Sequence, residues 1–207
     1  MVQEIIQTRR LSLQPLAPEH KDALYELDSN PDVMKYIFTG NPLTAEESTM
    51  VFDHLRSIPQ SSDGLGCWVG YDGDEFVGWW VLAPQQEGQE EASSERRNSD
   101  TSTSSSSRVE IGMRVAPKYW GQGYAKEGLR ALIKYSLEDY GADEVYGETM
   151  DVNTGSRVTM AKCGLKHVRT WHNKYEDFTP APGIEHGEVE YRLSKTDFQS
   201  QSTATAD

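Results

Sequence analysis

The feature that most constrains the fold is a strand that leads into a glycine-containing turn and then into a long amphipathic helix. The strand 108–115 ends before Pro117, glycines stand at 121 and 123, and apolar residues recur at helical spacing over 124–140. Glycine lets backbone N–H groups approach a ligand without interference from a Cβ atom. The helix adds its unpaired first-turn donors and the positive end of its dipole. The segment therefore predicts a binding site for an anion such as a diphosphate.

The residues around the turn exclude two other glycine-rich loops. The loop of nucleoside-triphosphate-binding proteins ends in a Lys-Ser or Lys-Thr pair, which this segment lacks. The dinucleotide-binding fingerprint needs glycine at position 126, where Lys126 stands. On the turn alone, an ordinary strand-to-helix corner remains the alternative.

The rest of the chain alternates between strand and helix patterns. We expect strands at 8–16, 67–71, 76–82, 144–149, 165–175 and 187–194, and helices at 19–27, 124–140 and 153–163. Thr44 and Glu47 form a capping box that opens a further helix, and Gly141 stands where a helix C-cap belongs. This order predicts an α+β or α/β fold whose mixed sheet has a parallel portion in its second half.

One segment departs from this pattern. Residues 85–107 contain eight serines, two threonines and a single apolar residue, Ala92. This composition cannot bury enough surface to offset the entropy of ordering, so we expect a disordered insertion. The insertion lies within a single predicted domain, 8–195, and residues 196–207 are expected to form a disordered tail.

The charge and the cysteines limit the partners and the location. The formal net charge of −13 argues against nucleic acid and favours a cationic amine substrate, although acidity that only keeps the protein soluble is the alternative. No apolar run is long enough to cross a membrane, and the N-terminus lacks a signal-peptide core. Cys67 and Cys163 have neither metal-ligand spacing nor disulfide density. We therefore expect a cytoplasmic protein without a metal.

Two motifs resemble the signatures of the GNAT N-acetyltransferase superfamily, and within it the branch of enzymes that acetylate the N-termini of ribosomal proteins. The first runs from Tyr119 to Gly128 and contains the two turn glycines. The second runs from Asn153 to Leu165 and is similar to the branch's Asn-x-x-Ser segment that ends in Lys-x-Gly-Phe. With the opening strand and first helix, the resemblance covers 8–195 apart from the insertion.

The resemblance implies a mixed, mostly antiparallel sheet whose two central parallel strands, 108–115 and 144–149, splay apart. The pantetheine arm of the co-substrate acetyl-CoA would lie in the gap, with its diphosphate on the turn. The cofactor-binding residues implied in this way are Met113, Arg114, Val115, Trp120, Gly121, Gln122, Gly123, Tyr124, Ala125, Lys126, Asn153 and Ser156.

Two residues are candidates for catalysis. Glu110, on the strand before the turn, is the candidate general base; the structural alternative is that it pairs with Arg114 or faces solvent. Asn153 would orient the pantetheine, and it can also cap a helix. Met160 replaces the family's frequent tyrosine general acid. This loss is tolerable because a thiolate, with a model thiol pKa of about 8.5, departs almost unassisted.

The sequence therefore predicts an acetyl-CoA-dependent N-acetyltransferase that transfers an acetyl group directly to a primary amine. The acceptor would be a peptide N-terminus or a small amine, such as a polyamine or an antibiotic, and the protein a monomer or a homodimer. A non-catalytic CoA-binding regulator and a purely structural module are the alternatives from other classes. The acceptor depends on loops 30–43 and 172–186, and the late-strand residues expected to line its pocket rather than to catalyse are Tyr175, His172, His186 and Tyr191.

Overall fold

The computed structural model describes residues 3–85, 107–176 and 178–204 of the chain. A single eight-stranded sheet runs through them in the order β1-β2-β3-β4-β5-β6-β8-β7. Within it β5 and β6 are parallel and the other neighbouring strands are antiparallel, which confirms the predicted fold class. The strands are β1 (Ile6–Gln7), β2 (Ser12–Pro15), β3 (Gly66–Asp72), β4 (Glu75–Pro84), β5 (Arg108–Val115), β6 (Glu144–Met150), β7 (Lys166–Trp171) and β8 (Glu188–Ser194).

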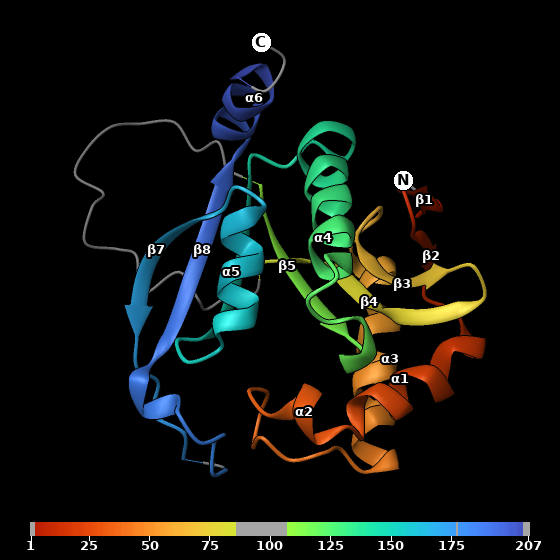
Figure 1. The fold of residues 1–207 in the computed structure, drawn as a ribbon, viewed down its shortest axis with the longest axis vertical. Helices are drawn as coiled ribbons and strands as arrows, with labels where there is room; N and C mark the ends of the chain where they lie inside the picture. The colour runs from red at the N-terminus through yellow and green to blue at the C-terminus, as the bar shows by residue number, and fades with distance from the viewer. Residues whose placement is uncertain (1–2, 86–106, 177, 205–207) are drawn as a thin grey trace.

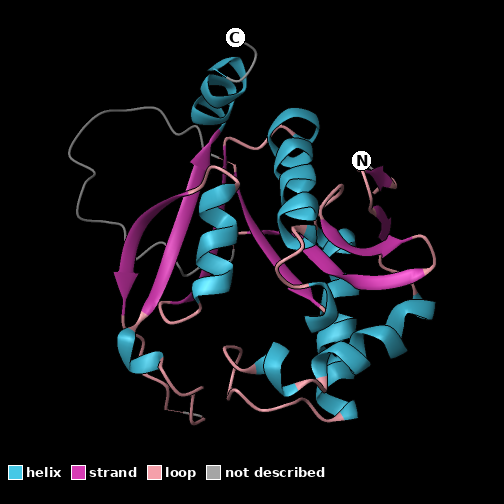
Figure 2. Ribbon diagram, in the orientation of Figure 1, coloured by secondary structure: helices cyan, strands magenta, loops and turns pink. Residues whose placement is uncertain are grey.

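Helices cover both faces of the sheet (Figure 1 and Figure 2). On one face α4 runs along β5 with α5 beside it, and α1 and α3 pack on the other face against β3 and β4. The helices are α1 (Lys21–Asp28), α2 (Pro31–Met34), α3 (Ala45–Ser61), α4 (Tyr124–Lys134), α5 (Thr154–Lys162) and α6 (Lys195–Ala204), with a π-helical stretch (Tyr135–Tyr140) that continues α4. No helix in the described ranges is long and apolar enough to cross a membrane.

Two neighbouring tryptophans on β4 connect the sheet to both helical layers. The Trp80 indole Nε1 donates to the Ala125 carbonyl of α4 at 3.2 Å. Gly128, one turn further along α4, lies so close to the Trp80 ring that a Cβ atom there would overlap it. Trp79 points to the opposite face, where the Arg114 guanidinium lies 5.0 Å from its ring centre. Helix α4 is therefore seated directly on the sheet.

The predicted helix ends are confirmed by their hydrogen bonds. The Thr44 hydroxyl accepts from the Glu47 N–H at 3.2 Å, and the Glu47 carboxylate accepts from the Thr44 N–H at 2.8 Å, which closes the capping box of α3. Gly141 ends the stretch after α4 with a left-handed φ of 90°, and its N–H donates to the Ser136 carbonyl at 3.1 Å. Both ends use the chemistry that the sequence patterns indicate.

The segment 8–16 is not the single strand that its alternation predicts. Residues 8–11 form a turn between β1 and β2, in which the Thr8 N–H donates to the Leu11 carbonyl at 2.9 Å. The Thr8 hydroxyl closes the turn by accepting from the Leu11 N–H at 2.8 Å. A threonine that bonds its own backbone in this way competes with the strand ladder, which the alternation pattern does not reveal.

The C-terminal prediction also needs correction, because residues expected to be disordered form α6. The Ser194 hydroxyl accepts from the Asp197 N–H at 3.1 Å, as a helix N-cap does, and Phe198 packs against the core. One cap and one aromatic anchor order a segment whose overall composition is polar. Of the predicted insertion 85–107, residues 86–106 lie outside the described ranges.

Candidate active site

The two parallel strands at the centre of the sheet separate after a short paired stretch. β5 and β6 pair over three positions, of which the last joins Glu110 to Tyr146. Beyond it β5 stays paired with β4 up to Val115, and β6 stays paired with β8 up to Met150. The strands therefore diverge into the wedge that the family resemblance implied.

The open edge of β5 presents backbone groups to this wedge. The Ala116 N–H donates to the Val77 carbonyl of β4 at 2.9 Å. Because bonded and non-bonded positions alternate along an antiparallel pair, the backbone groups of Val115 and Met113 point away from β4 and into the wedge. The Trp120 indole Nε1 donates to the Val115 carbonyl at 2.6 Å. At Met113 the backbone groups predicted to bind the pantetheine arm remain open to it. At Val115 the carbonyl already accepts a hydrogen bond from the Trp120 indole.

The turn after β5 holds a run of backbone donors. Gly121 and Gly123 have left-handed φ angles of 73° and 86°, a conformation that favours glycine. Within the described ranges, the N–H groups of residues 121–126 donate to no protein acceptor. They stand at the start of α4, where the helix dipole is positive. Unpaired donors in this number fit an anionic group such as the diphosphate of acetyl-CoA.

The side chains of the turn hold its shape. The Gln122 side chain donates to the Lys118 carbonyl at 2.6 Å, and the Tyr124 hydroxyl donates to Asp72. The Trp120 indole folds back over the end of β5, although the residue is 49% exposed. The turn is therefore braced by its side chains while its backbone donors remain available to a ligand.

Arg114, predicted to bind the cofactor, belongs instead to a buried ion pair. Its Nη1 donates to Asp28 Oδ1 of α1 at 2.6 Å, and the two side chains are 8% and 0% exposed. Ser48 of α3 approaches Asp28 Oδ2 at 3.5 Å. A buried carboxylate needs such a partner because its charge is costly to leave unpaired. The Arg114 side chain is therefore bound to α1, and the alternative in which it pairs with Glu110 is wrong.

The start of α5 borders the wedge on the β6 side. Asn153 Oδ1 accepts from the Ser156 N–H at 3.2 Å, and Asn153 Nδ2 donates to Thr149 Oγ1 at 3.0 Å. Asn153 is therefore the N-cap of α5, as its structural alternative stated. The Met160 side chain packs against Gly147 of β6, where a Cβ atom would come within 2.8 Å of the sulfur. A thioether thus occupies the place of the family's tyrosine and can donate no proton.

Four glutamates of β5, β6 and β8 lie on the face of the sheet opposite to α4 and α5, and we call them the acidic face. They are Glu110 of β5, Glu148 of β6, and Glu188 and Glu190 of β8. Glu148 is directly opposite Glu190 in the β6–β8 register. Burial and the charges of Glu110 and Glu190 raise the pKa of Glu148 to about 7. Burial also raises the pKa of Glu110.

The carboxylates of the acidic face differ in how well they are neutralised. Glu190 is fully buried, and it accepts hydrogen bonds from Arg108 at 2.9 Å and from Arg169 and Arg192. Against the effect of burial, these bonds hold the pKa of Glu190 below its ordinary value. In the part of the chain that the structure describes, the only ion-pair contact of Glu148 is with Arg169 Nη2, at 3.5 Å. Glu110 has no ion-pair partner among the described residues, so Glu110 and Glu148 are the groups able to take up a proton.

Glu148 was not among the residues predicted from the sequence. The residue lies in a short strand where polar and apolar side chains mix, and a glutamate there is read as an ordinary solvent-facing position. Only the register of β6 against β8, and the end of its pairing with β5, place it beside Glu110. A search for carboxylates on both predicted splayed strands would have found it.

The predicted acceptor loops meet one another. The Ala181 N–H donates to the Phe38 carbonyl at 2.9 Å, and the loops that follow α2 and β7 thus join at the lower edge of Figure 1. Tyr175 donates to Glu188 Oε2 at 2.7 Å and so extends the acidic face. The expectation that His172 and His186 lie on late strands is wrong: His172 follows β7, His186 lies in the 3₁₀ turn before β8, and both are exposed. Tyr191 lies on β8, as expected, and is buried.

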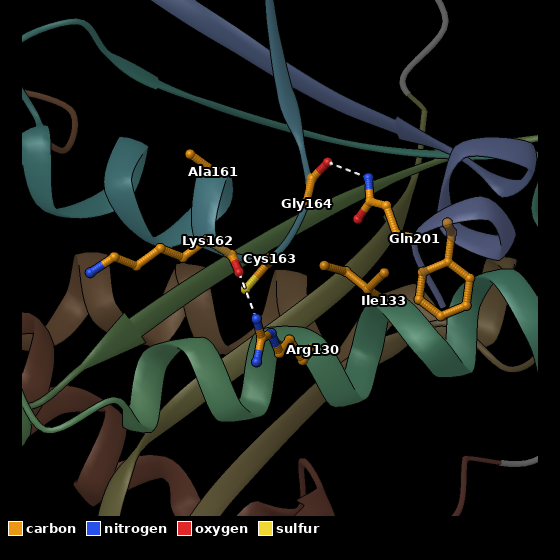
Figure 3. Close-up of a pocket in the computed structure, with 8 residues that line it drawn as sticks. Arg130, Ile133, Ala161, Lys162, Cys163, Gly164 and Gln201 are labelled. Atoms are coloured by element: carbon orange, nitrogen blue, oxygen red, sulfur yellow. Dashed lines mark hydrogen bonds between the residues drawn. The ribbon is translucent and has the colours of Figure 1, made fainter. Parts of the chain in front are cut away.

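A cavity of about 320 Å³ lies elsewhere, between α4, α5 and α6 (Figure 3). The Arg130 guanidinium beside it donates to the Lys162 carbonyl at 2.8 Å. Burial raises the pKa of the Cys163 thiol to about 11, so this lining holds no reactive thiolate. The cavity is near the C-terminal end of α5, whereas the backbone donors stand at the start of α4. No group of three His, Cys, Asp or Glu side chains in the described ranges could hold a metal ion.

Comparison with known proteins agrees with this geometry. Residues 10–166 match the family described as acetyltransferase (GNAT) domain. The FsC-acetyl coenzyme A-N(2)-transacetylase of Aspergillus fumigatus is 45% identical over 196 residues, which cover 95% of this chain and 78% of that protein.

Solved structures share the fold at low sequence identity. A ribosomal α-N-protein acetyltransferase in complex with coenzyme A is 14% identical with a TM-score of 0.69, over 92% of this chain and 98% of that chain. The spermidine N-acetyltransferase of Vibrio cholerae, in complex with CoA and spermine, is 14% identical with a TM-score of 0.66, over 92% and 98% of the two chains.

Proposed function

The chain belongs to the acetyltransferase (GNAT) family and is an acetyl-CoA-dependent N-acetyltransferase, and on that premise we propose how its residues divide the reaction. Bound acetyl-CoA supplies an activated acetyl group. The N–H groups of residues 121–126 hold its diphosphate, and the open edge of β5 at Met113 holds its pantetheine arm. Asn153 and Ser156 complete this site from the start of α5.

The acidic face receives the amine. An ammonium group is attracted to Glu110, which has no ion-pair partner among the described residues, and to Glu148, whose contact with Arg169 is 3.5 Å long. An α-amine with a free pKa near ~8 reaches its neutral form at pH 7 at a cost of about 1.4 kcal/mol. A base with a pKa near the working pH suits this proton transfer. The observation that carries the proposal is the position of Glu110 and Glu148 on one face where β5 and β6 separate, and burial with the neighbouring carboxylates raises the pKa of Glu148 there to about 7.

The proton and bond changes then balance within this site. The amine nitrogen loses a proton to the Glu110–Glu148 pair and forms its bond to the acetyl carbon, while the bond from that carbon to sulfur breaks. The pair returns its proton to water. Met160 contributes none, and the thiolate takes its proton from solvent, because a group with a model thiol pKa of about 8.5 leaves readily as an anion.

For the acceptor we propose a small-molecule amine of the kind named for the Aspergillus relative, rather than a peptide N-terminus. The support is the 45% identity over 95% of this chain, against 14% for the structures whose names carry ribosomal protein or spermidine. The acidic face attracts any of these cations, so the selection between them falls to the joined loops at Phe38 and Ala181.

The test is an acceptor panel with purified protein and acetyl-CoA, in which released thiol is measured. The panel contains FsC, a peptide with a free N-terminus, spermidine and a buffer blank. We expect thiol release above the blank with FsC and less with the other two. Release with the peptide alone would reject the proposed acceptor and leave the enzyme class intact. CoA binding without release for any amine would favour a regulator.

A further inference from the structure

Arg10, in the turn between β1 and β2, contacts the turn of backbone donors that precedes α4. The Arg10 backbone N–H donates to Glu127 Oε1 at 2.7 Å, and its side-chain Nε donates to Glu127 Oε2 at 2.7 Å. The Thr8 hydroxyl donates to Glu127 Oε1 at 2.7 Å as well. Glu127 lies in the first turn of α4. The N-terminal turn is thus fastened to the start of this helix.

The same guanidinium also holds the turn that precedes the helix. Arg10 Nη1 donates to the Gln122 carbonyl at 3.1 Å, and the guanidinium carbon lies 3.8 Å from the centre of the Tyr124 ring. One cation therefore contacts three successive parts of the same structure: the carbonyl of Gln122, the ring of Tyr124 and the carboxylate of Glu127.

The bond to the carbonyl fixes the direction of a donor. A trans peptide is planar, and its C=O and N–H bonds point in opposite directions. When Arg10 holds the Gln122 carbonyl, the N–H of Gly123 in the same peptide must point away from Arg10. This N–H is one of the unpaired donors at the turn. Gly123 has no side chain that would otherwise restrict rotation of this peptide.

Arg10 also neutralises a charge that would oppose an anion. Although burial acts in the other direction, the hydrogen bonds from Thr8 and Arg10 hold the pKa of Glu127 below its ordinary value. Glu127 is therefore an anion within one helical turn of the donors. Without Arg10 its charge would face an incoming diphosphate uncompensated.

We propose that Arg10 is a positioning residue for the diphosphate of acetyl-CoA, which acts by holding the Gln122–Gly123 peptide and by neutralising Glu127. The inference rests on the proposed function, because it assumes that the turn binds a diphosphate. It goes beyond that function by assigning part of the binding to a residue 112 positions away from Gln122 in the chain.

The neighbouring residue provides a matched control. Arg9 carries the same charge, is exposed, and forms no hydrogen bond or ion pair in the part of the chain that the structure describes. The variants are Arg10→Ala, Arg10→Lys and Arg9→Ala. Lysine keeps the charge but lacks the planar fork that contacts carbonyl and carboxylate together.

Calorimetry with three probes tests the proposal: CoA, 3′-dephospho-CoA, which keeps the diphosphate, and pantetheine, which lacks it. We expect Arg10→Ala to weaken CoA and 3′-dephospho-CoA by the same factor, about tenfold, as the loss of a hydrogen bond from a charged group would. Pantetheine affinity should not change. Arg10→Lys should fall between, and Arg9→Ala should match the wild type. Melting temperatures are recorded for every variant.

Other results overturn the proposal in distinguishable ways. Equal weakening of all three probes would show a general loss of structure, and no weakening in either Arg10 variant would show that Arg10 does not position the diphosphate; both leave the proposed function standing. If Arg10→Ala does not fold, an unchanged CoA affinity of Arg10→Lys rejects the inference. Absence of CoA binding by the wild type would reject the proposed diphosphate site itself, and the inference with it.

Discussion

The two halves of the site are built from different parts of the chain. The turn at residues 121–126 is one continuous segment whose ligand groups are backbone N–H donors. The acidic face is assembled from side chains of β5, β6 and β8, which are up to 80 residues apart between Glu110 and Glu190. The first, in our proposal, binds a diphosphate, whose charge stays constant during the reaction. The second must change its protonation. In this arrangement backbone dipoles bind the constant charge of the diphosphate, and neighbouring carboxylates carry out the proton transfer.

The sharpest way to separate the two regions is to remove the charges of the acidic face. We expect Glu110→Gln and Glu148→Gln each to lower kcat by about 10²- to 10⁴-fold, the range for loss of a general base, with unchanged CoA affinity. Steady-state kinetics and calorimetry give the two quantities. Glu26→Gln is the control, because Glu26 is exposed on α1 and lies outside both the acidic face and the acceptor loops. Full activity in both glutamine variants would show that the acidic face only attracts the amine.

The pH dependence of kcat probes the same region with a smaller effect. The base must be deprotonated, so activity should be lost as the pH falls through about 7, the value to which burial and Glu110 raise the pKa of Glu148. Below that value kcat at saturating acceptor should fall about tenfold per pH unit. In Glu148→Gln the residual activity should follow a different profile. A flat profile from pH 5 to 8 in the wild type would contradict this role.

For the turn at residues 121–126, the corresponding change is Gly121→Ala, which adds a Cβ atom. No atom lies within 4 Å of that Cβ, so the effect comes from the left-handed φ of 73° alone. The strain of about 1–2 kcal/mol should weaken CoA binding roughly tenfold and leave kcat nearly unchanged. Gly121→Asn should bind better than Gly121→Ala, since asparagine tolerates this conformation. Gly141→Ala, which places a Cβ at a left-handed φ of 90° with no atom within 4 Å, is the control. Equal affinity in all variants would show that the turn does not need its glycines.

The smallest expected effect is on stability. Glu148 has a folded-state pKa above its unfolded value, so its favourable contribution is present at low pH and is lost as the pH rises through about 7. Glu148→Gln should therefore raise the free energy of unfolding at pH 8 by about 1 kcal/mol and change it less at pH 5. Denaturant titrations at the two pH values measure this. A variant that is destabilised at pH 8 would mean that the Arg169 contact outweighs the cost of ionisation.

The same contrast explains how much could be predicted from the sequence. The conformation of the turn before α4 could be predicted from the sequence, because it is local and two glycines mark it; its binding of a diphosphate stays a prediction. The splayed strands were predicted through the family resemblance. Glu148 was missed because its role depends on which strands are neighbours, and pairing over that distance leaves no local signal.

Ion pairs between distant segments were missed for the same reason. Arg114 and Asp28 are 86 residues apart, and neither sits in a motif. Arg10 was placed in a strand, because the alternation of 8–16 outweighed the turn that Thr8 closes. Helix α6 was missed because its order depends on the Ser194 cap and a single phenylalanine. In each case a single long-range or capping contact, rather than the average composition of the segment, determines the local structure.

The seating of α4 on Trp80 has a consequence for evolution of the pocket. With no side chain at Gly128 to act as a spacer, and with the indole tied to Ala125, the height of the helix above the sheet is set by one ring. A different aromatic or aliphatic residue at position 80 would lower or tilt the whole platform that carries the turn. A substitution at position 80 would thus shift the turn from beneath α4, without changing any residue of the turn itself.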